Sequence, residues 1–210
     1  MDTKAFFKLS YGLYVVTTRD GENQSGCVAN TMTQVTSDPA QVCITLNKNN
    51  YTTDLIQKSG VLNVSVLTEE VPMETIRHFG FQSGRNVHKF ADVEAIPCSQ
   101  DIHGVYYLTR YSAASFACQV NQRIDVGTHV MFVCEVKDAR TLSASPVLTY
   151  ANYHLLKKGT TPKNAPSYIE EKQKKGWRCD VCGYIYEGET LPEDFVCPVC
   201  KVDRSHFQKI

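Results

Sequence analysis

The sequence lacks long apolar runs and lacks an excess of charge of one sign. No window of about 18 continuous apolar residues occurs among the 210 residues, which argues against a membrane-spanning helix. Basic and acidic side chains number 22 each, so the formal net charge is zero. This balance argues against a protein that binds nucleic acid mainly through bulk charge. Hydrophobic residues make up 42% of the chain, a fraction that excludes global disorder.

The N-terminus lacks the apolar stretch of an export signal, because Asp2, Lys4 and Lys8 interrupt it. We therefore expect a cytoplasmic protein, whose nine cysteines are thiols or metal ligands rather than a disulfide framework. A G-x-G-x-x-G fingerprint between a strand and a helix is also missing, which argues against a Rossmann-type dinucleotide site. Neither a Ser-His-Asp set nor a pair of catalytic carboxylates is evident.

The cysteines are unevenly distributed along the chain. Five are scattered on apolar-rich runs without C-x-x-C spacing and are expected to be inert packing residues: Cys27, Cys43, Cys98, Cys118 and Cys134. Four form two C-x-x-C pairs near the C-terminus: Cys179, Cys182, Cys197 and Cys200. Residues 177–210 bury too little apolar surface to fold unaided, so a metal is the expected stabiliser. The spacing predicts these four cysteines as ligands of a tetrahedral metal site.

The identity of the metal is open from spacing alone, because four thiolates bind both zinc and iron. Aromatic residues are dense around the cysteines: Trp177, Tyr184, Tyr186, Phe195 and Phe207. Such a shell excludes water and tunes a reduction potential, which favours a redox site over a structural zinc ribbon. The runs W-R-C-D-V-C-G-Y-I-Y-E-G and D-F-V-C-P-V-C resemble rubredoxin, although the loop between the pairs is shorter than in free-standing rubredoxins. This resemblance implies one iron, Fe(Cys)4, that carries one electron.

Short strand-like runs dominate residues 11–155. Alternating or β-branched patterns occur at 14–18, 42–47, 62–66, 114–120, 129–136 and 147–150. The residues at the ends of two segments predict helices. These segments are 52–59, which Gly60 follows, and 72–79, which Gly80 follows. Strands and helices do not alternate regularly, so we expect a mainly β fold, a β-barrel with short helices, rather than a doubly wound sheet.

Polar residues cluster at the ends of these predicted strands, at 29–39, 47–52 and 83–90. The second stretch runs into the first predicted helix, where Lys48, Thr52 and the free N–H groups would suit a phosphate. The alternative is a polar loop with an ordinary N-cap at Thr52. The third stretch adds the basic residues Arg85 and Lys89, which are either phosphate contacts or solvated surface charges.

Together these stretches resemble the flavin reductase-like family and its FMN-binding split β-barrel, over about residues 3–156. The resemblance rests on Y-G-L-Y-V-V-T-T at 11–18, N-T-M-T-Q-V-T-S-D-P at 30–39, N-K-N-N-Y-T at 47–52, S-G-R-N-V-H-K-F at 83–90 and S-P-V-L-T-Y at 145–150. We therefore expect a split barrel at 1–156, a rubredoxin-like domain at 177–210 and a connector at 157–176. The connector has six lysines against two glutamates and contains Pro162 and Pro166, which suits a mobile spacer.

The resemblance also implies which residues bind FMN. The 29–36 stretch would hold the flavin ring and ribityl chain, and the other two stretches would hold the phosphate. The implied set is Ala29, Asn30, Thr31, Met32, Thr36, Asn47, Lys48, Asn49, Thr52, Ser83, Gly84, Arg85 and Lys89. No catalytic side chain is expected, because hydride transfer depends on positioning. His129 is either a nicotinamide contact or a structural residue, and this chain has Gly127-Thr128-His129 where the family commonly has G-D-H. Tyr153 and His154 either flank the flavin ring or form a surface pair.

A flavin reductase-like barrel fused to a C-terminal rubredoxin domain is similar to the high-molecular-weight rubredoxins. This resemblance implies an oxidoreductase in which NAD(P)H, with NADH favoured, reduces FMN and the iron passes electrons to a partner protein. The implied partner is a flavodiiron protein that reduces oxygen or nitric oxide, and the implied assembly is a homodimer without nucleic acid or membrane. Two alternatives remain: a flavin reductase that releases reduced free flavin, and a non-redox zinc-ribbon binding protein.

Overall fold

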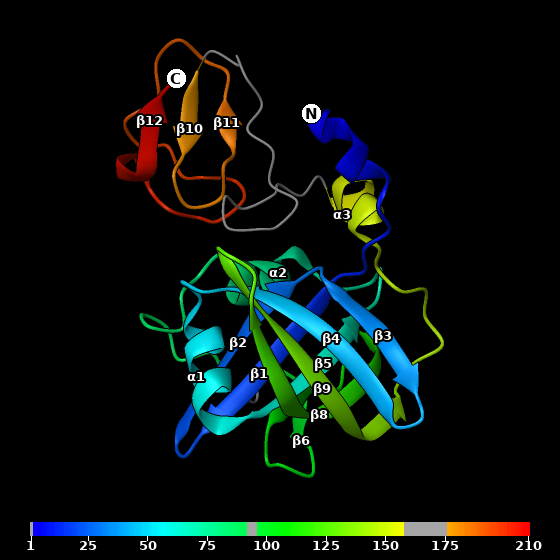
Figure 1. The fold of residues 1–210 in the computed structure, drawn as a ribbon. Coiled ribbons are helices and arrows are strands. Elements are labelled where there is room, and N and C mark those ends of the chain that lie inside the picture. The colour runs from blue at the N-terminus through cyan, green and yellow to red at the C-terminus, as the bar shows by residue number, and fades with distance from the viewer. Residues whose placement is uncertain (1, 92–95, 158–175) are drawn as a thin grey trace.

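The computed structural model describes residues 2–91, 96–157 and 176–210, and most of its strands belong to one curved antiparallel sheet (Figure 1). The strands of the barrel region are β1 (Tyr14–Asp20), β2 (Asn23–Ala29), β3 (Met32–Ser37), β4 (Ala40–Asn47), β5 (Val61–Leu67), β6 (Cys98–Gln100), β7 (Tyr106–Leu108), β8 (Ser112–Asp125) and β9 (His129–Thr141). The helices are α1 (Tyr51–Ser59), α2 (Met73–Gly80) and α3 (Tyr150–Lys157), with a short 3₁₀ helix at Thr3–Lys8. The mainly β fold expected from the sequence is confirmed.

The order of the strands in the large sheet decides which loops meet. Within the described residues the order is β2-β1-β5-β8-β9-β4-β3. Asn47, the last residue of β4, lies opposite His129, the first residue of β9. Tyr14, the first residue of β1, lies opposite Ala29, the last residue of β2. The sheet thus brings polar residues from distant parts of the sequence to neighbouring strand ends.

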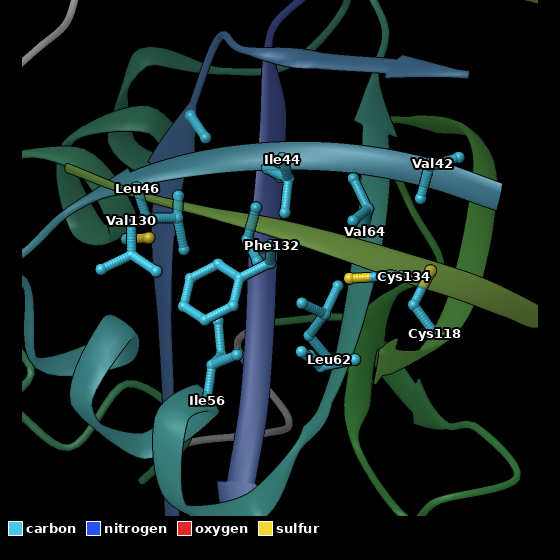
Figure 2. Close-up of a cluster of buried hydrophobic side chains, with 14 residues drawn as sticks. Val42, Ile44, Leu46, Ile56, Leu62, Val64, Cys118, Val130, Phe132 and Cys134 are labelled. Atoms are coloured by element: carbon cyan, nitrogen blue, oxygen red, sulfur yellow. The ribbon is translucent and has the colours of Figure 1, made fainter. Parts of the chain in front are cut away.

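The hydrophobic core lies inside the curve of this sheet (Figure 2). Alternation along β4 places Val42, Ile44 and Leu46 inward, with at most 4% of each side chain exposed. Phe132 of β9 and Ile56 of α1 are fully buried in the same cluster. The cluster anchors α1 to the sheet, so the start of α1 is held at a fixed place relative to β4.

Helix α1 begins and ends as its sequence favours. Asn50 is the N-cap, and its side-chain oxygen accepts a hydrogen bond from the Thr52 amide at 3.1 Å. The alternative N-cap at Thr52 is therefore wrong: the Thr52 hydroxyl instead bonds Ser25 of β2 at 3.1 Å. Gly60 ends the helix with a φ of 71°, a left-handed conformation that glycine adopts without a Cβ clash.

Several segments differ from the sequence-based expectations, and β6, β7 and most of α3 were not predicted. The predicted strand at 147–150 forms only isolated bridges, from Val147 to Thr68 and from Thr149 to Gly12, and Tyr150 already begins α3. Strand β2 was not predicted, because its polar sequence N-Q-S-G-C-V-A has no clear alternation. Strand β3 lies in the stretch interpreted as a polar strand end, and from Thr33 to Ser37 its side chains are exposed. An exposed edge strand has little apolar signal.

The C-terminal domain has its own small sheet. Its strands are β10 (Trp177–Cys179), β11 (Ile185–Tyr186) and β12 (Phe207–Lys209), in the order β11-β10-β12, and a short 3₁₀ helix spans Arg204–His206. Its core is the four cysteines with Leu191, Val199 and Phe207. The connector predicted at 157–176 falls almost wholly outside the described residues. No helix in the described parts of the chain is long and apolar enough to cross a membrane.

Three of the five scattered cysteines, Cys27, Cys118 and Cys134, are buried in the barrel, and burial raises the pKa of each thiol. For Cys134 the pKa rises from 9.0 to about 12. At a pH between these two values, the Cys134 thiol has lost its proton in the unfolded chain and has kept it in the folded protein. The free energy of unfolding must therefore fall as the pH rises above about 9, by about 1.4 kcal/mol per pH unit for each such thiol.

Replacing Cys134 with alanine is expected to remove one of these contributions. The variant should be less stable than the wild type near pH 8, and the difference should shrink by about 1.4 kcal/mol per pH unit above pH 9. Urea unfolding at several pH values between about 8 and 11 measures this slope. Parallel stability curves for the two proteins would contradict the buried-thiol interpretation.

Candidate functional site

A cavity of about 410 Å³ opens at the end of the sheet where β2 and β4 end. Its volume is within the range of small-molecule and cofactor sites. The strand ends contribute Ala29, Asn30 and Asn47, and the start of β9 contributes His129. The segment after α2 contributes residues 80–83, and α3 contributes Tyr150 and Tyr153. The loops that meet here are separated by most of the barrel sequence.

One part of the cavity wall is apolar and aromatic. Leu13, Ile76 and Phe79 are buried behind it, each with at most 2% exposure. Tyr150 and Tyr153 stack with ring centroids 5.9 Å apart and an interplanar angle of 20°. Flat aromatic surfaces of this kind bury the planar faces of a ring system and exclude water from it. Tyr153 is only 3% exposed and lines the cavity, so the alternative of a surface pair with His154 is wrong for Tyr153.

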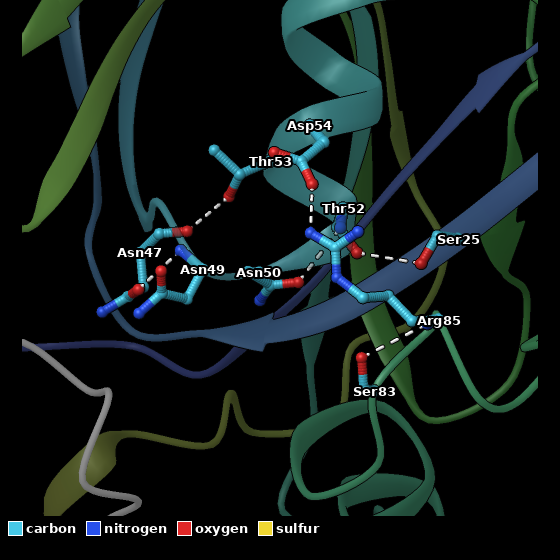
Figure 3. Close-up of polar contacts among 9 residues, drawn as sticks. All are labelled: Ser25, Asn47, Asn49, Asn50, Thr52, Thr53, Asp54, Ser83 and Arg85. Carbon is cyan, nitrogen blue, oxygen red and sulfur yellow. Dashed lines mark hydrogen bonds and ion pairs between the residues drawn. The ribbon is translucent and has the colours of Figure 1, made fainter.

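The opposite part of the wall is polar (Figure 3). Asn30 is 5% exposed, and Asn47, Asn49 and Asn50 follow one another around the start of α1. The Asn47 carbonyl accepts from the Thr53 hydroxyl at 2.8 Å, and the Asn47 side chain accepts from the Asn49 amide at 2.9 Å. These bonds fix the loop, so its amide groups are held in position before a ligand arrives. Amides without formal charge suit the polar rim of a heterocyclic ring.

The loop that follows α2 packs closely against α1 and β2. A Cβ on Gly84 would lie 2.3 Å from the Ser25 hydroxyl oxygen and 2.9 Å from the Tyr51 ring, so this approach requires glycine. Arg85 forms an ion pair with Asp54 of α1, and its guanidinium carbon lies 5.2 Å from the centre of the Tyr51 ring. Figure 3 shows Arg85 reaching across to the first turn of α1. Arg85 is thus held beside the N-terminus of α1, with its charge matched by Asp54.

The structure brings only part of the predicted FMN-binding set to the cavity. Its wall includes Ala29, Asn30, Asn47, Asn49 and Ser83. The other predicted residues lie outside the wall: Thr31, Met32, Thr36, Lys48, Thr52, Gly84, Arg85 and Lys89. The predicted residue set omitted Asn50 and Tyr51, although they belong to the 47–52 stretch, and sequence reasoning missed Phe81 and Gln82; all four line the cavity. An asparagine directly before a helix is the signal that could have identified Asn50.

Several of the residues outside the wall have partners within the chain. The Thr31 hydroxyl donates to the Thr45 carbonyl at 2.8 Å, and the Thr36 hydroxyl donates to the Pro39 carbonyl at 2.6 Å on exposed β3. Lys48 pairs with Asp125 at 2.7 Å. Met32 packs against the barrel core. Their roles toward FMN stay a prediction.

Lys89 is buried, with 1% exposure, although it is charged. Its ammonium donates to the Gln82 carbonyl at 2.7 Å and to the His78 carbonyl at the end of α2. Burial lowers the pKa of Lys89 to about 8, so the ammonium still carries its proton at neutral pH. A cation at the C-terminus of a helix satisfies carbonyls that lack helical partners. Lys89 therefore fixes the cavity-lining segment that follows α2.

The four cysteines of the C-terminal domain form a compact cluster. All four sulfur atoms lie within 4.8 Å of one another, and all four residues are buried. The Sγ atoms of Cys179 and Cys200 are 3.6 Å apart, and those of Cys182 and Cys197 are 3.5 Å apart. These separations are far longer than a disulfide bond and close to the edge of a tetrahedron, about 3.8 Å for metal–sulfur bonds of about 2.3 Å. The donor set and its geometry fit one tetrahedral metal ion.

The C-terminal domain also touches the cavity. Asp180 and Val181, which lie between the first two cysteines, line the same cavity as Asn30 and Ser83. The four-sulfur cluster and the cavity are therefore neighbours.

Both the barrel and the C-terminal domain match known protein families. Residues 6–158 match the flavin reductase like domain, and residues 177–208 match the rubrerythrin, rubredoxin-like domain. The chain is 39% identical to the high molecular weight rubredoxin of Moorella thermoacetica, with 100% of both chains covered. It is 45% identical to a ferric-chelate reductase (NAD(P)H) of Archaeoglobus fulgidus, covering 82% of this chain and 100% of that protein. An NADH:FAD oxidoreductase from Streptomyces globisporus has the same fold, with a TM-score of 0.62 and 23% identity over 70% of this chain and 84% of that one.

Proposed function

This chain belongs to the flavin reductase-like family and carries a C-terminal rubredoxin-like domain, and on that premise we propose that it is an NAD(P)H-dependent electron-transfer enzyme. Electrons from the nicotinamide enter at the barrel cavity, pass to one iron held by Cys179, Cys182, Cys197 and Cys200, and leave to a partner protein. The observation that carries the proposal is the contact between the two sites, since Asp180 and Val181 of the metal domain line the cavity.

The two cofactors supply the redox chemistry. A flavin held in the cavity would supply hydride acceptance from NAD(P)H and one-electron release; the single iron would take one electron, pass it to the partner and then take the second. The side chains of this protein would bind and orient the flavin and the nicotinamide. The aromatic side chains of Tyr150, Tyr153 and Phe79 would exclude water from the flavin ring. The asparagine wall, which is Asn30, Asn47, Asn49 and Asn50, would fix the polar edge of that ring. His129 lies at the cavity edge, where it is a candidate contact for the nicotinamide.

We further propose FMN as the flavin and NADH as the preferred donor. Support for a mononucleotide is the 410 Å³ volume of the cavity, whose wall includes the start of α1 at Asn50 and Tyr51, where a terminal phosphate would be held. Support for NADH is the name of the Streptomyces enzyme that shares the fold.

The proposed acceptor is a flavodiiron protein that reduces oxygen or nitric oxide, the acceptor that the resemblance of the sequence to the high-molecular-weight rubredoxins implies. The C-terminal domain has four basic and six acidic side chains, a net charge of −2 that would favour a basic docking surface on the acceptor. We also propose a homodimer, supported by the exposed apolar side chains of Val35, Ile124 and Val126 on and beside the barrel strands.

An anaerobic stopped-flow experiment tests the proposal. Mixing NADH with the oxidised, flavin- and iron-loaded protein is expected to bleach the flavin absorption first and the iron absorption second, while NADPH acts more slowly. Metal analysis of the same sample should give one iron per chain. A colourless metal site with zinc, or a flavin that reduced nicotinamide leaves oxidised, would contradict the proposal.

A second function is favoured by the 45% identity to a ferric-chelate reductase. In this case the acceptor is a ferric chelate that takes single electrons directly at the barrel cavity. The two functions differ in their need for the C-terminal metal: ferric-chelate reduction at the barrel does not need the four cysteines, whereas electron delivery to a partner does.

A further inference from the structure

Helix α2 carries a side chain that reaches the C-terminal domain. Nη2 of Arg77 donates to the backbone carbonyl of Pro198 at 3.2 Å. Pro198 lies between Cys197 and Cys200, in the second cysteine pair. Nη1 of Arg77 binds Glu74 at 2.9 Å, one turn earlier in the helix, and the arginine side chain is only 18% exposed. The guanidinium is therefore fixed by its own helix in the orientation that meets the metal domain.

Two further contacts surround this bond. Phe81, at the C-terminus of α2, packs against the barrel cluster that contains Phe79 and also against the cluster that contains the four cysteines. The pKa of Glu74 is lowered by a hydrogen bond from its own backbone amide, and also by the charges of Arg77 and of Lys201, which follows Cys200. An apolar contact with charged groups beside it has the composition of a specific, reversible interface.

The same contact covers the cavity. With the second cysteine pair seated on α2, the first pair presents Asp180 and Val181 to the cavity wall beside Phe81 and Ser83. The metal cluster is thereby next to the cavity, and a flavin held there would be enclosed.

We propose that α2 is an intramolecular docking site for the rubredoxin-like domain, and that Arg77 is the positioning residue that seats this domain over the flavin cavity for electron transfer. This inference rests on the proposed function. Because Asp180 and Val181 occupy part of the cavity mouth, the docked domain and an incoming nicotinamide compete for access. The domain therefore docks after the hydride has been delivered and undocks before the next one.

The test uses the full-length protein loaded with flavin and iron, with Arg77→Glu and the milder Arg77→Gln. A hydrogen bond from a charged donor contributes about tenfold or more to an equilibrium, so the equilibrium constant for docking should fall by about that factor. We expect a larger radius of gyration in small-angle X-ray scattering and about tenfold faster dissociation of the flavin. Reduction of the iron after the flavin should slow by about tenfold in stopped-flow experiments, whereas Arg77→Lys should recover most of the wild-type behaviour.

Arg140→Gln is the matched control, because Arg140 pairs with Asp138 on β9 and loses the same charge. It should behave as the wild type in all three measurements. Unchanged scattering and unchanged flavin dissociation in Arg77→Glu, with normal thermal unfolding, would overturn the docking proposal. Failure of the proposed function has a different signature: the wild type itself would show no reduction by nicotinamide, while scattering would still separate docked from undocked protein.

Discussion

Replacing Cys182 with alanine is expected to abolish metal binding in the C-terminal domain and to reduce electron delivery to a partner protein by at least about 100-fold. The sulfur of Cys182 is buried, and the cluster has no spare donor within 4.8 Å among the described residues. Metal binding supplies about 10–16 kcal/mol of folding free energy to small domains of this kind, so loss of one ligand should also unfold residues 177–210. Metal analysis, the visible spectrum and partner reduction measure the three effects.

Cys98→Ala is the control for this experiment. Cys98 is partly exposed on β6 and does not belong to the four-sulfur cluster, so its loss should change neither the metal content nor the spectrum. The barrel of the Cys182→Ala variant should still be reduced by nicotinamide. If that variant also delivers electrons to the partner at the wild-type rate, the iron is not on the electron path, and the ferric-chelate function gains support.

Phe132→Ala is expected to lower the free energy of unfolding of the barrel by about 3–5 kcal/mol, the usual cost of removing a buried aromatic ring. Phe132 is fully buried on the inner face of β9, between Ile44 of β4 and Ile56 of α1 (Figure 2). Removing the ring leaves a cavity beneath α1, the helix that directly follows Asn47, Asn49 and Asn50. Urea unfolding followed by circular dichroism measures the change, and weaker flavin binding should accompany it.

Phe6→Ala serves as the comparison, because Phe6 is 48% exposed and its removal creates no interior cavity. This variant should stay within about 1 kcal/mol of the wild type. A Phe132→Ala protein as stable as Phe6→Ala would mean that the barrel interior repacks without loss, contrary to the close packing of the cluster.

The parts of the molecule that could be predicted from the sequence are those determined by residues that lie close together along the chain. Two C-x-x-C pairs place four thiols in one cluster whatever the rest of the chain does, and the structure brings these four sulfurs together. Strict alternation along Val42, Ile44 and Leu46 identified β4, because one face of that strand is buried. The helix was predicted at 52–59 from its charges and from Gly60, and the structure has it at Tyr51–Ser59.

The parts that the sequence did not predict depend on distant partners. Lys48 and Arg85 are the cations expected at a phosphate, yet each is paired with an acid far away in the sequence, Asp125 and Asp54. Lys89 is buried under the end of α2, a position that no local pattern indicates. Tyr153 reaches the cavity because the start of α3 is bonded to the segment before β1, where the Tyr150 amide donates to the Tyr11 carbonyl at 2.8 Å; local propensity carries no information about that contact.

The two domains differ in how far apart their paired residues lie along the chain, and this difference sets the order in which they assemble. Closing the barrel requires β4 to meet β9, so Asn47 must find His129. In the C-terminal domain all four ligands lie between residues 179 and 200. Since local contacts form faster than distant ones, we expect the thiols to capture their ion while the barrel is still open. The choice between iron and zinc is then made by the ions that are available as residues 177–210 fold, whether or not the barrel has already formed its flavin site.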